Sequence, residues 1–159
     1  MIASRRELFS NSAKVAALML ASGLFSQVAQ AAQGAGPVAA KGAFDAKTLA
    51  DVVQVLGYSV PLESKDVSIT APDIAENGAV VPLGAATTLA GVKQILLLVE
   101  KNPTVLAALF NLTPDVESAL STRVKMAQSS TVYAVAVTQD NKVFFASKEV
   151  KVTLGGCGG

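Results

Sequence analysis

The only cysteine of the chain, Cys157, is the side chain whose type and position suggest covalent chemistry. It stands third from the C-terminus within the pentapeptide GGCGG. The sequence contains no histidine, which removes every histidine-dependent catalytic triad and nearly all zinc and copper sites. A single cysteine also excludes an intrachain disulfide and a cysteine-ligated cluster. We therefore expect no metal and no cofactor, and we expect the thiol to be the reactive group.

The glycines around this cysteine make its segment thin and conformationally free, because a residue without Cβ adopts backbone conformations that are closed to others. The hinge of this arm consists of Gly155, Gly156, Gly158 and Gly159. The last strand is predicted to end at Leu154, so residues 155–159 extend beyond the domain, and the thiol reaches roughly 10 Å past the strand. Ordering a flexible residue costs about 1–2 kcal/mol, so the arm alone should dock weakly. Weak docking favours a carrier over a catalytic nucleophile, which must be held still. The sequence thus predicts a substrate carrier and not an enzyme.

Three other interpretations of the tail stay open. Cys157 could form an interchain disulfide, since an exposed thiol in an oxidising compartment tends to find another; the protein would then be a structural periplasmic β-sandwich in a disulfide-linked assembly. The glycine-rich end could carry an incidental cysteine. The terminal Gly-Gly could serve for conjugation, although export would separate it from ATP.

Residues 1–31 have the organisation of an export signal. Arg5 and Arg6 form a positive region, residues 15–25 are an apolar run, and Ala29-Gln30-Ala31 is a small-x-small cleavage pattern. The paired arginines in SRRELF resemble a twin-arginine (Tat) signal, which exports folded proteins. A run of about 11 residues is too short for a hydrocarbon core of roughly 30 Å. We expect cleavage after Ala31, a periplasmic location and no membrane anchor.

Composition points to one globular domain with an ordinary surface. Of the 159 residues, 51% are hydrophobic and 16% charged, with a formal net charge of +1. Removal of residues 1–31 leaves 10 basic and 11 acidic residues, a net charge of −1. A nearly neutral protein has no electrostatic attraction for nucleic acid or acidic lipid, so neither is an expected partner.

The pattern of the mature chain predicts one helix followed by strands. Residues 32–42 are rich in glycine and alanine and are interpreted as a flexible lead-in to a domain over residues 43–154. An apolar repeat at helical spacing predicts a helix with Asp45 as N-cap and Gly57 as stop. The repeat comprises Leu49, Val52, Val53 and Leu56.

Alternating and β-branched segments after Gly57 predict about seven strands. They cover 67–71, 79–83, 92–99, 105–112, 120–126, 132–138 and 143–154. In residues 120–126 an apolar set alternates with Ser121, Arg123 and Lys125, and the polar residues 139–142 predict a hairpin between the last two strands. These features indicate a mainly β fold, an immunoglobulin-like β-sandwich with one N-terminal helix.

Two predicted strands are apolar on both faces. In QILLLVE, Ile95, Leu97 and Val99 point one way, and Leu96 and Leu98 the other; residues 105–112 repeat the pattern. A sandwich core covers one face only. Either the N-terminal helix packs on the second face, or residues 105–112 are partly helical, or the face is a lasting subunit interface, which is the interpretation we favour from the sequence.

The tail KVTLGGCGG resembles the C-terminus of the SoxY family, the Y subunit of the bacterial sulfur-oxidation carrier. SRRELF, TAPDIAENGAVVPL (70–83) and STRVKMAQSSTVYAVAV (121–137) fit the same family. Within the second stretch, Pro72 and Pro82 bracket a turn at Asn77-Gly78, and Asp73 and Glu76 are expected in a solvated loop.

The resemblance implies a periplasmic heterodimer with a SoxZ-like subunit and a role in thiosulfate oxidation. In such a system, c-type cytochromes join thiosulfate oxidatively to the arm thiol as an S-thiosulfonate. A manganese hydrolase then releases sulfate and leaves a persulfide, which a further sulfane-oxidising enzyme acts on. Carried over, the attachment residue is Cys157.

Overall fold

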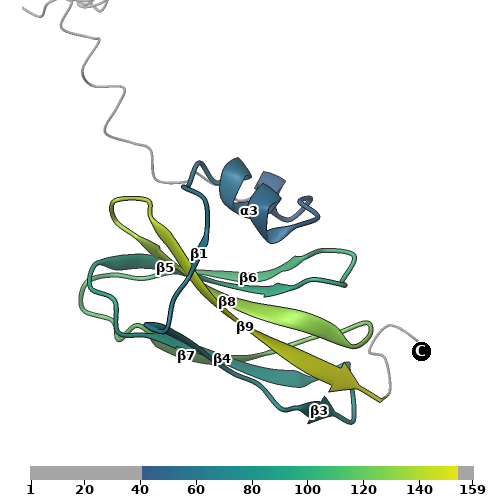
Figure 1. Ribbon diagram of the computed structural model, residues 1–159. Coiled ribbons are helices and arrows are strands. Elements are labelled where there is room, and N and C mark those ends of the chain that lie inside the picture. The colour runs from purple at the N-terminus through teal and green to yellow at the C-terminus, as the bar shows by residue number, and fades with distance from the viewer. Residues whose placement is uncertain (1–40, 154–159) are drawn as a thin grey trace, which may run out of the picture. The chain divides into compact units, whose positions relative to one another are not determined.

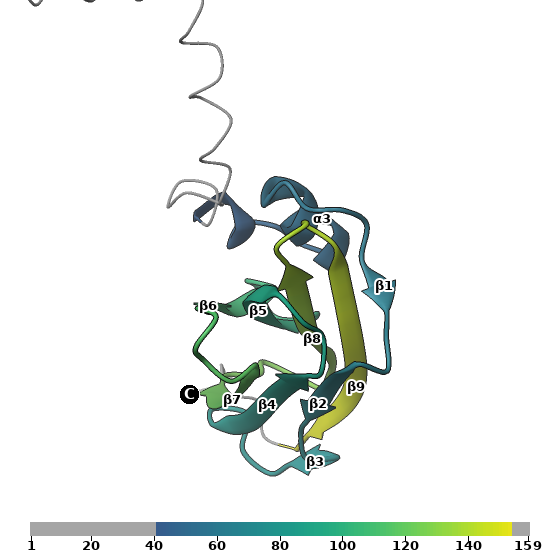
Figure 2. The ribbon, with the colours of Figure 1, turned by 90° about the vertical axis from the view of Figure 1, so that its left-hand side faces the viewer.

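A computed structural model describes residues 41–153. They form two β-sheets packed face to face, with the helix α3 outside the larger sheet and a further helical turn at residues 41–43 (Figure 1). Figure 2 shows the two layers edge-on. The prediction of a mainly β, immunoglobulin-like fold is confirmed.

The larger sheet has the strand order β1-β9-β8-β5-β6, and β3 also pairs with β9. Its strands are β1 (Leu62–Glu63), β3 (Ile74–Ala75), β5 (Val92–Val99), β6 (Leu106–Asn111), β8 (Ser130–Thr138) and β9 (Val143–Val152). The two short strands pair with β9 in parallel, while the long neighbours are antiparallel. The β8–β9 hairpin predicted around residues 139–142 is present, and Asn141 takes the turn position with φ of 63°.

The smaller sheet has the antiparallel order β2-β4-β7. Its strands are β2 (Val67–Thr70), β4 (Val81–Thr87) and β7 (Ala119–Val124). Along β7, Leu120, Thr122 and Val124 are more buried than their neighbours, so the predicted alternation is confirmed. The main core lies between the two sheets and includes Leu83, Ile95, Leu97 and Val132.

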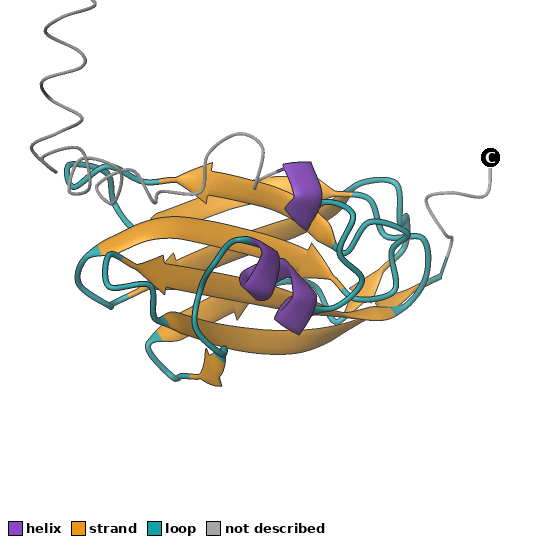
Figure 3. Ribbon diagram, turned by 90° about the horizontal axis from the view of Figure 1, so that it is seen from above, coloured by secondary structure: helices purple, strands orange, loops and turns teal. Residues whose placement is uncertain are grey.

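The second face of the larger sheet is covered by the helix. α3 (Leu49–Val55) lies across this face, as seen in Figure 3. Val52, Val53 and Leu56 join Leu96 and Leu98 in a second buried cluster, in which both leucines are 0% exposed. Our interpretation of this face as a subunit interface is therefore wrong, because the chain's own helix already removes it from water.

The N-cap of the helix lies three residues after the predicted one. Thr48, with an extended backbone, is the N-cap and accepts a hydrogen bond from the backbone N–H of Asp51 at 3.1 Å, so the assignment to Asp45 was wrong. Gly57 has φ of +75° and follows the C-cap Leu56, which confirms the predicted stop.

The described residues contain nine strands, two more than predicted, because β1 and β3 have only two residues each. β4 begins and ends later than the predicted 79–83. The first positions of the predicted strand, residues 79 and 80, belong to the turn that follows Asn77. Gly84, Ala85 and Ala86 continue the strand, because β4 pairs with β2 on one side and with β7 on the other. Residues 106–111 form a strand and not a helix.

Candidate functional site

The residues predicted to carry the chemistry lie outside the described residues. This holds for Cys157, for the four glycines of the arm, and for Arg5 and Arg6 of the export signal. The structure does describe the part of the chain from which the arm continues, residues 151–153 at the end of β9. We call these three residues the arm base.

The arm base is held on one side by the segment that contains β3. The backbone N–H of Lys151 donates to the carbonyl of Asp73 at 3.0 Å, and that of Thr153 donates to the carbonyl of Ala75 at 3.1 Å. The Thr153 hydroxyl also donates to the carbonyl of Glu76 at 2.9 Å. Three hydrogen bonds within three residues therefore keep the chain ordered up to Thr153.

Ser129 holds the arm base from the other side. Its hydroxyl oxygen accepts a hydrogen bond from the backbone N–H of Val152 at 2.9 Å. Ser129 directly precedes β8, the antiparallel neighbour of β9. The serine hydroxyl thus takes the place of a backbone carbonyl as the acceptor for Val152, at the point where the pairing of β8 with β9 ends.

The β3 segment is itself fixed to the sandwich. Lys148 on β9 pairs with the carboxylate of Asp73 at 2.9 Å and donates to the carbonyl of Ala71 at 2.5 Å. Asn77 closes the following turn, since its side-chain oxygen accepts from the N–H of Ala79 at 2.8 Å. The carbonyl of Gly78 accepts from the N–H of Met126 at 2.7 Å.

These contacts give the stretch PDIAENG a structural role that the sequence did not reveal. The predicted turn at Asn77-Gly78 is confirmed, and Asp73 and Glu76 are exposed as expected. Asp73 nevertheless pairs with Lys148, so it is more than a solvated residue. The proline and asparagine signalled the turn, but nothing in the sequence indicated its contact with β9, more than 70 residues away.

The groups with shifted pKa values do not lie at the arm base. Asp140, in the turn at the opposite end of β9, has its pKa lowered to about 2 by hydrogen bonds from Lys142 and Thr138. Burial raises the pKa of Tyr58, whose hydroxyl donates to Gln94 beside the helix. Both sets of contacts are structural, because they tie a hairpin turn and the α3 connection to the sheet.

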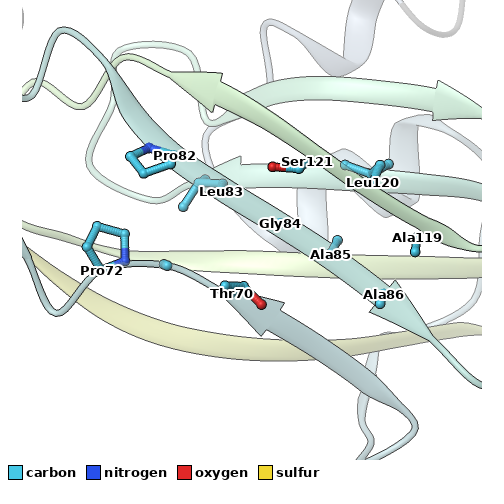
Figure 4. A pocket seen from close by; sticks show the side chains of 11 residues that line it. Thr70, Pro72, Pro82, Leu83, Gly84, Ala85, Ala86, Ala119, Leu120 and Ser121 are labelled. Carbon is cyan, nitrogen blue, oxygen red and sulfur yellow. The ribbon is translucent and has the colours of Figure 1, made fainter.

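A hollow of about 660 Å³ lies over the outer face of the smaller sheet (Figure 4). Its lining is of small residues such as Thr70, Gly84, Ala86 and Ser121, with Pro72 and Pro82 at one end. A Cβ on Gly84 would approach Cβ of Thr70 to 3.3 Å, so any larger residue there would require β2 to shift by a few tenths of an ångström. The lining offers hydroxyl and backbone groups, and it includes no acidic or basic side chain that could activate the hydroxyls of Thr70 and Ser121.

Other signals of a site are weak within the described chain. Residues 41–153 contain no group of three or more His, Cys, Asp or Glu side chains that could hold a metal ion. No helix in the same range is long and apolar enough to cross a membrane.

Comparison with protein families gives a match to SoxY, the sulfur oxidation protein, over residues 52–157. The chain belongs to the SoxY family. The matched range covers the sandwich and the arm base and ends at Cys157.

A solved member of the family has the same fold. The sulfur carrier protein SoxY from Chlorobium limicola f. thiosulfatophilum is 35% identical, with a TM-score of 0.53 over 59% of this chain and 84% of that one. A superoxide reductase (neelaredoxin) from Ignicoccus hospitalis is 21% identical over 54% of this chain and 79% of its own, with a TM-score of 0.48. A putative superoxide reductase from Thermotoga maritima is 14% identical over 60% and 95%, with a TM-score of 0.49. No curated protein matches the chain.

Proposed function

We propose that the protein is a periplasmic sulfur carrier of thiosulfate oxidation, in which Cys157 covalently holds sulfur intermediates and presents them to partner enzymes. The observation that carries this proposal is the extent of the family match, which reaches Cys157 and stops there. The solved relative at 35% identity is named a sulfur carrier protein. The hydrogen-bonded arm base supports the same role, because it fixes the point from which the cysteine-bearing segment continues.

A carrier needs a fixed origin and a free end. Hydrogen bonds from two sides keep the chain ordered up to Thr153, four residues before the thiol. Four residues extend at most about 14 Å, so the thiol can explore only a small volume around one end of the sandwich. A small volume raises the effective concentration of the thiol for a partner that docks at this end.

The proposed chemistry balances without a catalytic group from this chain. The thiol and thiosulfate form an S–S bond, giving the cysteine S-thiosulfonate, one proton and two electrons, and the c-type cytochromes accept the electrons. Water then cleaves the bond between sulfane and sulfonate sulfur on the manganese hydrolase, releasing sulfate and leaving the cysteine persulfide. Sulfane-oxidising enzymes would act on that persulfide. The protein is thus a substrate of each step and not an enzyme.

Export and assembly belong to the same proposal. The twin-arginine-type signal with Arg5 and Arg6 would export the folded protein, together with a SoxZ-like subunit as a heterodimer. Folded export suits a carrier whose partner is bound before it reaches the periplasm.

Intact-protein mass spectrometry tests the proposal on mature protein purified from thiosulfate-grown cells. We expect adducts on the wild type with the mass of a thiosulfonate or of added sulfur atoms, removed by reductant. The Cys157→Ser variant, purified in parallel, should carry none.

A bare thiol under those conditions would refute the carrier function. A disulfide-linked protein dimer without sulfur adducts would refute it as well and would favour a structural protein assembled through Cys157. The location has its own test: Arg5→Lys combined with Arg6→Lys should leave the uncleaved precursor in the cytoplasm, whereas continued export would exclude a twin-arginine route.

A further inference from the structure

A groove of about 450 Å³ runs between β6 and β7, which lie on the same side of the two sheets (Figure 2). Part of its lining is apolar and consists of Phe44, Leu106, Ala107 and Ala108. The polar part includes Thr104, Thr122, Arg123 and Lys125. None of the described residues that line it is acidic. The groove therefore suits a ligand that has an apolar body and an anionic end.

The two cations of the groove are available to such an anion. Arg123 and Lys125 are both exposed, and neither belongs to an ion pair within residues 41–153. The ion pairs of that range are Lys142–Asp140 and Lys148–Asp73. A guanidinium presents several N–H donors in a planar fork, and an ammonium adds a compact positive charge. A sulfonate group, whose three oxygens share a single negative charge, is a ligand of the kind that this pair would bind.

One loop connects the groove to the arm base. This loop runs from Lys125, after the end of β7, to Ser129, which accepts from the N–H of Val152 at 2.9 Å. Asn102 lines the groove and holds the start of the loop. Its side chain donates to the carbonyl of Lys125 at 2.7 Å and accepts from the N–H of Ala127 at 3.0 Å. The groove and the arm base thus lie at the same end of the sandwich.

The arm is long enough to bring Cys157 to the groove. Lys125 and Ser129 are four residues apart, so they are separated by at most about 14 Å. The four residues from Thr153 to Cys157 span the same distance of about 14 Å when extended. The long side chain of Lys125 and an adduct on Cys157 cover the remaining distance between Ser129 and the arm base.

We propose that this groove receives the S-thiosulfonate that Cys157 carries, with Arg123 and Lys125 binding the sulfonate oxygens and the apolar lining covering the sulfane sulfur. The inference rests on the proposed carrier function, which supplies the anionic adduct. A thiolate that attacks the sulfur of Cys157 displaces thiosulfate and forms a mixed disulfide, so an exposed adduct is lost to any thiol. An adduct that lies in the groove is shielded from this attack until a partner enzyme takes the arm.

Two features select the chain's own arm and this groove over other combinations. A surface contact between a cation and an anion is weak, so a dilute free anion would rarely occupy the groove. A tether of a few residues instead holds the adduct at a millimolar effective concentration. Lys151, in the arm base, is a poorer partner, because exposed Glu149 lies two residues earlier on the same face of β9 and offsets its charge.

Amide chemical shifts of the isotope-labelled mature chain test the proposal. Tetrathionate loads the protein without any partner enzyme, because its reaction with the Cys157 thiol gives the S-thiosulfonate, thiosulfate and one proton. We expect loading to shift the amides of residues 106–108 and 122–125, independently of protein concentration. The neutral adduct formed with iodoacetamide is the control and should leave these amides unchanged.

The rate at which dithiothreitol removes the thiosulfonate measures the shielding. Arg123→Gln and Lys125→Gln should each raise this rate by roughly two- to fivefold, the worth of one exposed ion pair. Loss of a cation weakens the attraction of the attacking thiolate, so a faster removal reports exposure of the adduct. Lys65→Gln is the matched control and should have no effect, because this exposed lysine lies near Ala119, at the opposite end of β7.

Three results would overturn the proposal. They are amides in the groove that do not respond to loading, equal shifts with the neutral adduct, and removal rates that neither glutamine variant raises. A protein that carries adducts in cells and gives any of these results refutes the groove alone. A protein that carries no adduct in cells refutes the carrier function, whatever the chemically loaded protein shows.

Discussion

Ser129→Ala should loosen the arm base without weakening the sandwich. The hydroxyl oxygen of Ser129 is the acceptor for the N–H of Val152 at 2.9 Å. Without this oxygen the N–H of Val152 has no acceptor at the end of β9. The loss of a hydrogen bond from a half-buried donor costs about 1–2 kcal/mol. Because the loss is confined to the last residues of β9, it should appear as local opening, increased by a factor of roughly 5–30.

Native-state amide hydrogen exchange measures that opening residue by residue. We expect the Val152 amide to exchange faster in Ser129→Ala by this factor, while the amide of Leu97 in the core keeps its protection. Ser68→Ala is the control, because Ser68 donates a hydrogen bond of 3.2 Å to the carbonyl of Ala86 within the smaller sheet and makes none to the arm base. Unchanged exchange at Val152 would refute the reasoning, and so would a uniform loss of protection across the core.

Three further predictions concern the fold. Leu96→Ala should lower the unfolding free energy by about 3–5 kcal/mol in urea titrations, because this buried side chain packs in the second buried cluster, beneath α3. Val55→Ala, on the exposed side of α3, is the control and should lower it by less than about 0.5 kcal/mol. Asn141→Ala should cost about 1 kcal/mol in thermal unfolding and Asn141→Gly much less, since φ is 63°. The lowered pKa of Asp140 means that its carboxylate stabilises the fold above its ordinary pKa near 3.8, and that this contribution disappears as pH falls to about 2. The difference in unfolding free energy between wild type and Asp140→Asn should therefore fall to zero as the pH is lowered from about 3.8 to about 2. A difference that does not change with pH would contradict this prediction.

The sequence predicts well those elements that local pattern specifies. β5 matches the predicted 92–99 at both ends, because Gly91 precedes it and its apolar run 95–99 is followed by the polar residues 100–102. The β8–β9 hairpin follows from its short polar connection. In both cases the signal lies within one segment of the chain.

Elements that depend on distant partners were missed. β3 has two residues, too few for any alternation, and exists because it lies along the end of β9. The prediction of a subunit interface at Leu96 and Leu98 was wrong for a related reason. Periodicity shows that both faces of a strand are apolar, but it does not say which element covers each face. Here the covering element is α3, which comes from the same chain.

The arm base escaped prediction because main-chain atoms supply most of its contacts. The acceptors in the β3 segment are the carbonyls of Asp73, Ala75 and Glu76, which any residue type could provide. The path of this segment therefore matters more than its side chains. We expect Glu76→Ala to leave the exchange protection of the Lys151 and Thr153 amides unchanged, whereas deletion of Glu76 should shift the carbonyls out of register and lower the protection. Equal effects of the two variants would mean that the Glu76 side chain, and not the path of the backbone, holds the arm base.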